Sequence, residues 1–262
     1  MINQISLNDE CRLTPSRIGM IQGWLALYFL LPEEEFGNLR FCLQDSVHLV
    51  AQRQKAFDEH VEKATEGLDN EERVFCYDHY SEEHERLHGK FQQLVSASTL
   101  LMACSLFEST LTDLCKYLDG LPTNLGLPSP KKTGTKARLK LITRWEDVKS
   151  SGILRPAAFL RKNFRVEAGR YSEWNTILGH YEVRHCLAHA NGDVGLMRVN
   201  NGKQLKKLLQ KQPFSVIKIN DSGRLQFGSG YVKSVLDHMR GFLGALHAAC
   251  FTNKILGPHF WP

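Results

Sequence analysis

The sequence lacks the cysteine pairs and glycine-rich loops that mark several common protein classes. Its 7 cysteines are odd in number and scattered singly, with no C-x-x-C pair. Structural zinc sites usually bring cysteines in close pairs, and disulfide frameworks belong to oxidising compartments. We therefore expect neither feature, and we expect a protein of the reducing cytoplasm. The sequence also contains no glycine-rich loop that would cradle a phosphate.

Long apolar runs are also scarce. The apolar stretch over residues 18–31 is 14 residues long and contains Gln22, whereas a membrane-spanning helix needs about 20 apolar residues. No small-residue cleavage site follows it, only Pro32 and the acidic residues 33–35. We therefore expect a buried helix that ends at Pro32, in preference to a membrane anchor.

What the chain does contain is enough apolar material for a core and an uneven distribution of charge. Its 262 residues are 42% hydrophobic and 10% aromatic, which excludes disorder and fits one large or two small domains. The formal charge is +5, yet residues 32–90 hold 15 acidic and 7 basic side chains, and residues 131–211 hold 18 basic and 6 acidic ones. This asymmetry indicates either a surface for a polyanion or two solvated faces that attract each other.

Helical periodicity dominates the front of the chain. Apolar residues recur at helical spacing over residues 38–68, and Gly67 marks the end of that helix. A second, polar helix is predicted over residues 71–88. Its His84 and His88 are four residues apart and could hold a metal ion from one helix face. The sequence indicates no third ligand, so we interpret this pair as part of a solvated face.

Two further helices are predicted to form the core. Residues 94–118 are apolar or small on most sides, as in a central helix. Glu108 lies within that apolar stretch, so it should be paired with a buried arginine or placed at a functional site. Residues 171–190 form the second core helix, which should end at Asn191-Gly192 because glycine accommodates the left-handed backbone of a helix end.

The rest of the chain predicts a loop, a hairpin and a closing helix. Proline, glycine and threonine after Gly120 indicate the loop. Residues 214–219 and 224–227 alternate in polarity around an Asn-Asp-Ser-Gly turn, which is typical of a β-hairpin, and residues 231–249 form a last amphipathic helix. The expected fold is an all-α helical bundle, in which an N-terminal helical region (1–92) precedes a domain (93–262) that carries the small C-terminal hairpin.

The side chains best suited to catalysis lie in the segment YEVRHCLAHANG, residues 181–192. Arg184 offers a planar cation that can hold a phosphate through two hydrogen bonds, and His185 and His189 can transfer protons. On a helix the two histidines are about 40° apart and share a face, whereas Arg184 and His189 are about 140° apart. A second copy that completes the site across a twofold axis would relieve this separation.

The string R-H-x-x-x-H-A-N-G resembles the signature of the HEPN superfamily, in which an arginine and a polar residue precede a histidine. The upstream helix, with the sequence LLMACSLFESTLTDLC, resembles the other core helix of that family. The resemblance covers residues 95–192 and, more loosely, the hairpin and closing helix. It implies a HEPN-like, usually dimeric all-α domain.

The resemblance also implies an activity, that of a metal-independent endoribonuclease in toxin, antiviral defence or RNA-processing systems, with no cofactor. Attack by the ribose 2′-OH would leave a 2′,3′-cyclic phosphate and a 5′-OH, and DNA should resist cleavage. Arg184 and His189 would be the catalytic pair with His185 as the polar second residue, while Glu108 and Asn191 would support them. The expected RNA-binding residues are Lys131, Lys132, Lys136, Arg138, Lys140, Arg161, Lys162 and Arg165.

Other interpretations of the same residues stay open. Some members of the family have lost catalysis and bind RNA or a partner protein, such as the second half of a toxin-antitoxin or defence pair. His189 could cap its own helix, and Arg184 could form an ordinary ion pair with Glu182 or Glu108. His185 and His189 could also hold a divalent metal, although no nearby cysteine or carboxylate completes the set.

Overall fold

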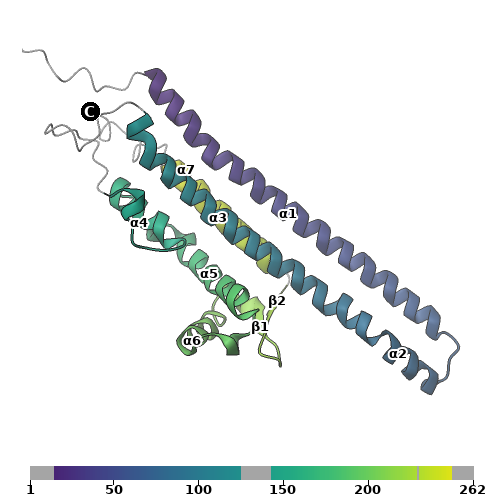
Figure 1. Cartoon of the computed structure of the whole chain (residues 1–262). Helices are drawn as coiled ribbons and strands as arrows, with labels where there is room; N and C mark the ends of the chain where they lie inside the picture. The colour runs from purple at the N-terminus through teal and green to yellow at the C-terminus, as the bar shows by residue number, and fades with distance from the viewer. Residues whose placement is uncertain (1–14, 125–142, 229, 250–262) are drawn as a thin grey trace, which may run out of the picture. The chain divides into compact units, whose positions relative to one another are not determined.

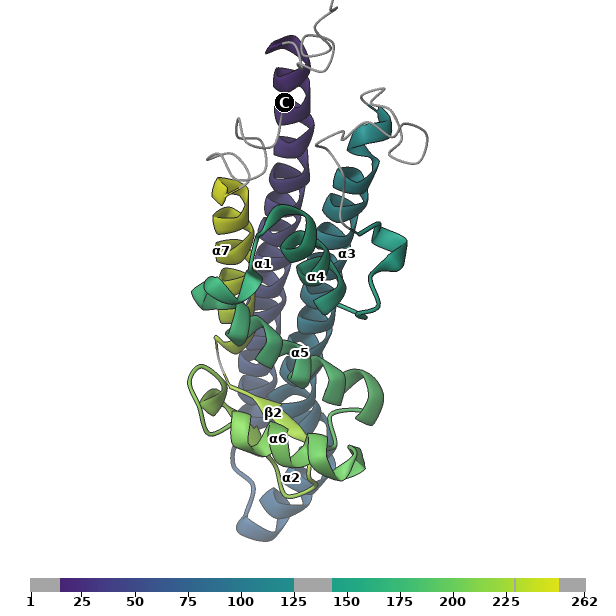
Figure 2. The same ribbon diagram turned by 90° about the vertical axis from the view of Figure 1, so that its left-hand side faces the viewer.

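A computed structural model describes residues 15–124, 143–228 and 230–249 of the chain. The described chain is mostly helical with one small antiparallel sheet, which confirms the expected helical fold with a hairpin (Figures 1 and 2). The helices are α1 (Pro15–Thr65), α2 (Asn70–Glu85), α3 (Phe91–Asn124), α4 (Leu154–Phe164), α5 (Ser172–Ala190), α6 (Val199–Leu208) and α7 (Tyr231–Ala249), and the strands are β1 (Ile217–Ile219) and β2 (Leu225–Phe227).

The described residues form two compact units. The first contains the described parts of residues 1–34, 105–177 and 238–262, and the second contains residues 35–104 and 178–237. Helices α1, α3, α5 and α7 each supply residues to both units. Each unit is therefore assembled from segments that lie far apart in the sequence.

Helix α1 contradicts the prediction of a buried helix that ends at Pro32. The helix runs through this proline to Thr65, and Trp24 is 53% exposed. A proline inside a helix removes one backbone donor and costs roughly 3 kcal/mol. Phe29 and Phe36, one turn to either side, are 6% and 0% exposed, and their burial offsets that cost. The far end agrees with the prediction, because Gly67 follows with a φ of 80°.

Helix α2 and helix α3 are joined without a loop. Asp69 caps α2, because its side chain accepts a hydrogen bond from the backbone N–H of Glu72. The side chain of Glu72 in turn accepts a hydrogen bond from the backbone N–H of Asp69. One π-helical turn, η1 (Arg86–Lys90), then leads directly into α3. The loop expected after Gly120 begins later, because α3 continues to Asn124.

The continuous helix over Asn70–Gly120 also passes a length and composition test for a membrane span. One 18-residue window of it has a mean hydropathy of 1.4, and 39% of that window is buried inside the structure. The core helix of a packed bundle has the same properties. Leu100, Phe107 and Leu114, for example, are each 0% exposed.

The core of the first unit is aromatic. The Phe242 ring of α7 lies 5.7 Å from that of Phe107 on α3 and 5.1 Å from that of Trp174 on α5. Asp119, near the end of α3, is 8% exposed and accepts a hydrogen bond from the backbone N–H of Trp145. The ring contacts hold α3 and the N-terminal part of α5 against α7 within this unit, and the hydrogen bond ties the segment before α4 to the end of α3.

The second unit contains the hairpin, whose register follows the predicted turn. Ile217 pairs with Phe227 and Ile219 pairs with Leu225. The side chain of Asn220 accepts a hydrogen bond from the backbone N–H of Arg224 across the turn. Gln93 of α3 fixes the strand end, since its side chain both donates to the C=O and accepts from the N–H of Phe227.

Helix α5 packs so closely on the turn before β1 that a side chain at Gly179 would overlap a buried ring. A Cβ built on Gly179 would lie 2.4 Å from Cζ of Phe214. The Phe214 ring is 3% exposed and is confined by the rings of His180 and Tyr231, whose centroids lie 5.0 and 6.4 Å away. The ring therefore has little room to move.

We expect the substitution Gly179→Ala to lower the free energy of unfolding by about 1–3 kcal/mol, as overpacking of a core does. The matched control is Gly244→Ala in α7, where a new Cβ meets nothing within 4 Å and alanine should be neutral or slightly stabilising. Thermal unfolding followed by circular dichroism compares the two variants. Equal midpoints for both would contradict the close packing.

Candidate functional site

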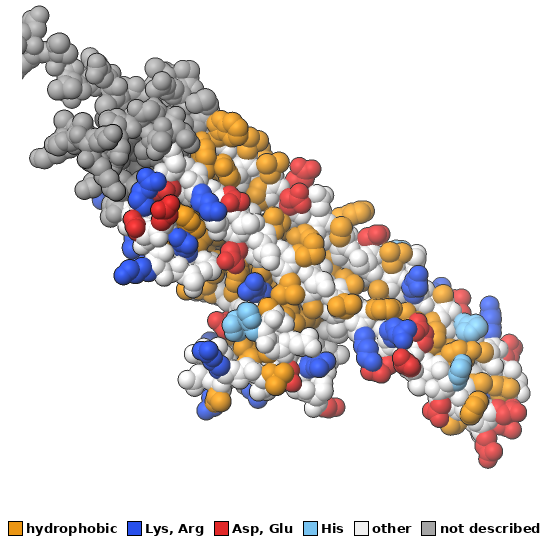
Figure 3. Space-filling model, viewed as in Figure 1, with side chains coloured by type: hydrophobic (Ala, Val, Ile, Leu, Met, Phe, Trp, Pro, Cys, Tyr) orange, Lys and Arg blue, Asp and Glu red, His pale blue; other side chains and the backbone are white. Residues whose placement is uncertain are grey.

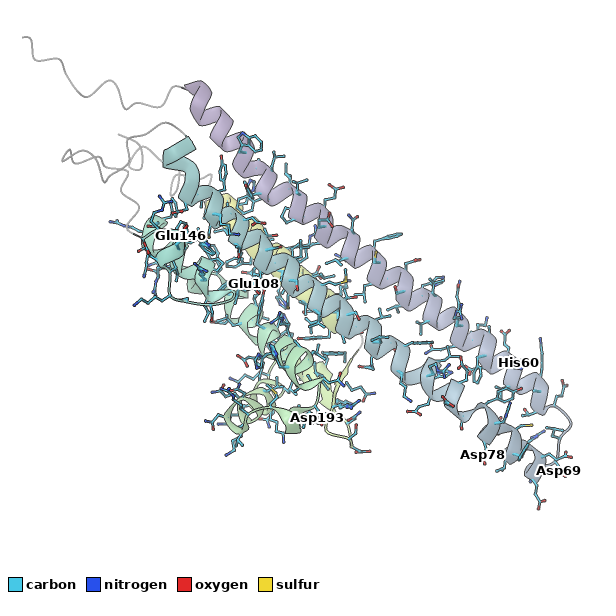
Figure 4. The ribbon with its side chains drawn as sticks, viewed as in Figure 1. His60, Asp69, Asp78, Glu108, Glu146 and Asp193 are labelled. Carbon is cyan, nitrogen blue, oxygen red and sulfur yellow. The ribbon has the colours of Figure 1, made fainter. Side chains whose placement is uncertain are left out.

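The end of α5 carries the residues singled out by the sequence. The helix ends at Ala190, as predicted, because Asn191 and Gly192 have φ values of 50° and 77°. The N–H of Gly192 donates to the C=O of Cys186 at 3.1 Å and closes the helix end. Asn191, expected to support the site, is exposed and contributes this left-handed backbone. Asp193, labelled in Figure 4, follows immediately.

His185 and His189 lie together on the outer face of α5. Their ring centroids are 4.6 Å apart with an interplanar angle of 50°, and both side chains are exposed. The shared face predicted from their spacing is therefore confirmed. Within the described residues, neither ring makes a hydrogen bond, so His189 does not cap its own helix there. Figure 3 shows histidine side chains at the surface near the end of α5.

Arg184 points differently from the two histidines. It is half-buried, and its Nε is buried without a hydrogen-bond partner. Within the part of the chain that the structure describes, Arg184 forms no ion pair, so the predicted alternative of a bond to Glu182 is not formed. A buried guanidinium nitrogen without an acceptor is costly, and Nε of Arg155 and of Arg240 is buried in the same way.

Cys186 lies between these residues in sequence but faces the core. Its side chain is 0% exposed. Burial, with a smaller contribution from the nearby Asp193 carboxylate, raises the pKa of the Cys186 thiol to about 11. The thiol is therefore protonated at neutral pH, and this cysteine does not act as a nucleophile.

Glu108 belongs to the first unit, whereas Arg184, His185 and His189 belong to the second. Glu108 is half-buried on α3 (Figure 4). A Cβ built on Gly152, just before α4, would lie 3.8 Å from its Oε1. Among the described residues, Glu108 has no ion-pair partner, so a pairing with a buried arginine is not found there.

Part of the expected RNA-binding set is visible. Arg161, Lys162 and Arg165 are exposed at the C-terminal end of α4. Arg161 also lines a cavity of about 540 Å³ whose wall includes Glu167 and Trp174. The other members of the set lie outside the described residues: Lys131, Lys132, Lys136, Arg138 and Lys140.

The sequence did not predict a buried polar contact that lies about one turn before Arg184. His180 is 0% exposed, and its Nδ1 lies 3.0 Å from the hydroxyl of Tyr231 in α7. Burial holds the pKa of the Tyr231 hydroxyl well above its ordinary value, so this group stays protonated. The only sequence signal was a histidine inside an apolar run, which is more often part of a core than of a site.

Comparison with known proteins adds no assignment, since no protein-family description, curated protein or solved structure matches the chain.

We expect Cys186 to resist alkylation by iodoacetamide at pH 8, while the exposed Cys42 of α1 reacts. A rise of the pKa from 9.0 to about 11 leaves about 100-fold less thiolate at that pH, and burial slows access further. Peptide mass spectrometry after timed labelling measures both rates. Labelling in urea is the control, where the two cysteines should react alike; equal rates in the native protein would overturn the core-facing placement.

Proposed function

We propose that the chain is a metal-independent endoribonuclease with a HEPN-like fold. The observation that carries this proposal is the pair of exposed imidazoles at the end of α5, 4.6 Å apart, next in sequence to Arg184, which forms no ion pair within the described residues. These are the groups that phosphodiester transfer without a metal requires. The resemblance of the RHCLAHANG segment to the HEPN signature supports the same reaction.

Each residue has a defined role in the proposed reaction. A base must remove the proton of the ribose 2′-OH as its oxygen attacks the adjacent phosphorus, and an acid must protonate the departing 5′-oxygen. His189 serves as the main proton-transfer group, and His185 is the second. Arg184 stabilises the charge that develops on the phosphate oxygens. The products are a 2′,3′-cyclic phosphate end and a 5′-OH end.

The geometry of α5 favours a site shared by two copies of the chain. In-line displacement places the attacking and leaving oxygens on opposite sides of the phosphorus. Two rings with centroids 4.6 Å apart leave no room for a phosphate between them. Arg184 and His189 are five residues apart and therefore about 140° apart around the helix, so one copy does not present both to the same side of a phosphate. A homodimer resolves this, since each copy supplies the group that the other lacks.

RNA binding in this proposal relies on basic side chains outside the motif. Arg161, Lys162 and Arg165 are exposed on α4 and form no ion pair among the described residues. Clustered cations of this kind gain affinity by releasing counterions from the phosphate backbone. Within the cytoplasmic toxin or defence systems expected from the resemblance, a regulatory protein would control access to such a site.

We expect the wild-type protein to cleave RNA but not DNA in excess EDTA. Arg184→Ala and His189→Ala should each lower the cleavage rate by roughly 10²–10⁴-fold. The first removes the group that stabilises charge, and the second removes the group that transfers protons. His79→Ala is the matched control, since this exposed histidine lies on α2 and should leave the rate unchanged. Rates come from gel analysis of a labelled RNA, with folding checked by circular dichroism.

Two outcomes would contradict the proposal. Cleavage that persists in both folded variants would show that Arg184 and His189 are not the catalytic residues. No cleavage by the wild type, together with tight RNA binding that Arg184→Ala weakens, would show instead an RNA-binding module of the same fold.

A further inference from the structure

A second group of histidines lies on other elements of the second unit, and the ribonuclease proposal does not use it. His84 occupies the last turn of α2, and His88 lies in the π-helical turn η1. Asp58 reaches them from α1, 30 residues before His88 in the sequence. The third ligand that the sequence did not indicate is therefore supplied by a different helix. Figure 3 shows histidine and acidic side chains gathered at the surface around α2.

The three side chains form a compact set of donor atoms. Nε2 of His88 lies 2.9 Å from Oδ1 of Asp58. The rings of His84 and His88 are stacked, with centroids 4.3 Å apart and an interplanar angle of 22°. One ligand atom from each of the three residues can be chosen so that all lie within 4.8 Å of one another. The ligands of a tetrahedral zinc ion, at 2.0–2.1 Å from the metal, are roughly 3.3 Å apart, so small rotations of the side chains suffice.

The donor set has the chemistry of a transition-metal site. Two imidazoles and one carboxylate are ligands that Zn²⁺ and neighbouring divalent ions accept, and a site with three protein ligands keeps a position for water. His84 takes no part in the ion pair between Asp58 and His88; its ring contacts those of Phe57 and His88. That ring makes no hydrogen bond within the described residues, so its nitrogens are available to a metal.

The surroundings also favour a cation. Asp58 and His84 line a cavity of about 620 Å³ together with Glu62 and Asp78, of which Asp78 is labelled in Figure 4. The carboxylates of these residues raise the local concentration of cations. All three candidate ligands are exposed, so an ion can reach them from solution.

We propose that Asp58, His84 and His88 bind one divalent transition-metal ion of the zinc type, which ties α1 to α2 and η1. The other contacts between α1 and this segment include the rings of Phe57 and Tyr80, whose centroids lie 5.9 Å apart. Helix α2 buries none of its own residues, and its links to α1 include the Tyr80 hydroxyl at 3.3 Å from Nε2 of His60. An ion that binds the folded segment and not the unfolded one stabilises it by mass action.

Calorimetric titration of the whole chain with ZnCl₂ tests this site. The wild type should bind one Zn²⁺ ion per chain, and Asp58→Asn, His84→Ala and His88→Ala should each raise the Kd at least about 10-fold, since even residues that only orient metal ligands contribute that much. His79→Ala is the matched control, because His79 is an exposed histidine on the same helix but outside the group, and it should bind as the wild type does.

A second readout separates this site from scattered binding to the 11 histidines of the chain. Co²⁺ in place of Zn²⁺ should give the visible absorption of a nitrogen- and oxygen-ligated site in the wild type and in His79→Ala, and lose it in the three site variants. Unchanged Kd values in folded site variants, or an equal loss in His79→Ala, would overturn the assignment. Ribonuclease activity is measured in EDTA, so either proposal can fail without the other.

Discussion

The burial of one side of α5 is the constraint on which the candidate site depends. Ile177, Val183 and Cys186 are each 0% exposed, and helical geometry places His185 and His189 on the side of α5 away from these three residues. His185 and His189 are exposed for this reason, not because of any contact of their own. The left-handed residues Asn191 and Gly192 stop the helix directly after them. Packing and the end of the helix thus place two imidazoles at an accessible position.

Two histidine pairs with the same spacing have different surroundings, and this difference decides their assignment. His84 and His88 meet a carboxylate from α1, which completes a ligand set. His185 and His189 have no third metal ligand within the described residues, and the neighbouring Cys186 faces the core as a protonated thiol. The proposed metal site therefore uses the first pair, and the proposed ribonuclease uses the second. Sequence spacing alone does not distinguish them.

Local rules predicted the elements that local residues control. The Asn-Asp-Ser-Gly turn fixed the hairpin, and Asn191-Gly192 fixed the end of α5, because both depend on backbone preferences within a few residues. The same kind of rule failed at Pro32, where the packing of Phe29 and Phe36 keeps α1 helical. Periodicity also gave no sign that α2 and α3 are joined through a π-helical turn.

Contacts between residues that lie far apart in the chain could not be predicted from the sequence. The approach of Asp58 to His88 depends on where the turn at Gly67 and the cap at Asp69 reverse the chain. The pairing of His180 with Tyr231 joins residues 51 positions apart. In the site itself, the shared face of the two histidines followed from their spacing. The unpartnered Nε of Arg184 depends on what surrounds α5 and needed the structure.

The central claim, a ribonuclease site shared by two copies, is tested most directly by mixing inactive variants. Arg184→Ala and His189→Ala are denatured together, refolded as a mixture and assayed for RNA cleavage in EDTA. Each mixed dimer contains one intact site, built from the wild-type His189 of one copy and the wild-type Arg184 of the other. Random pairing makes about half of the dimers mixed, and only one of their two sites is intact. The account therefore predicts recovery of about a quarter of the wild-type activity. A mixture as inactive as each variant alone, although wild-type protein treated in the same way regains activity, would contradict the shared site.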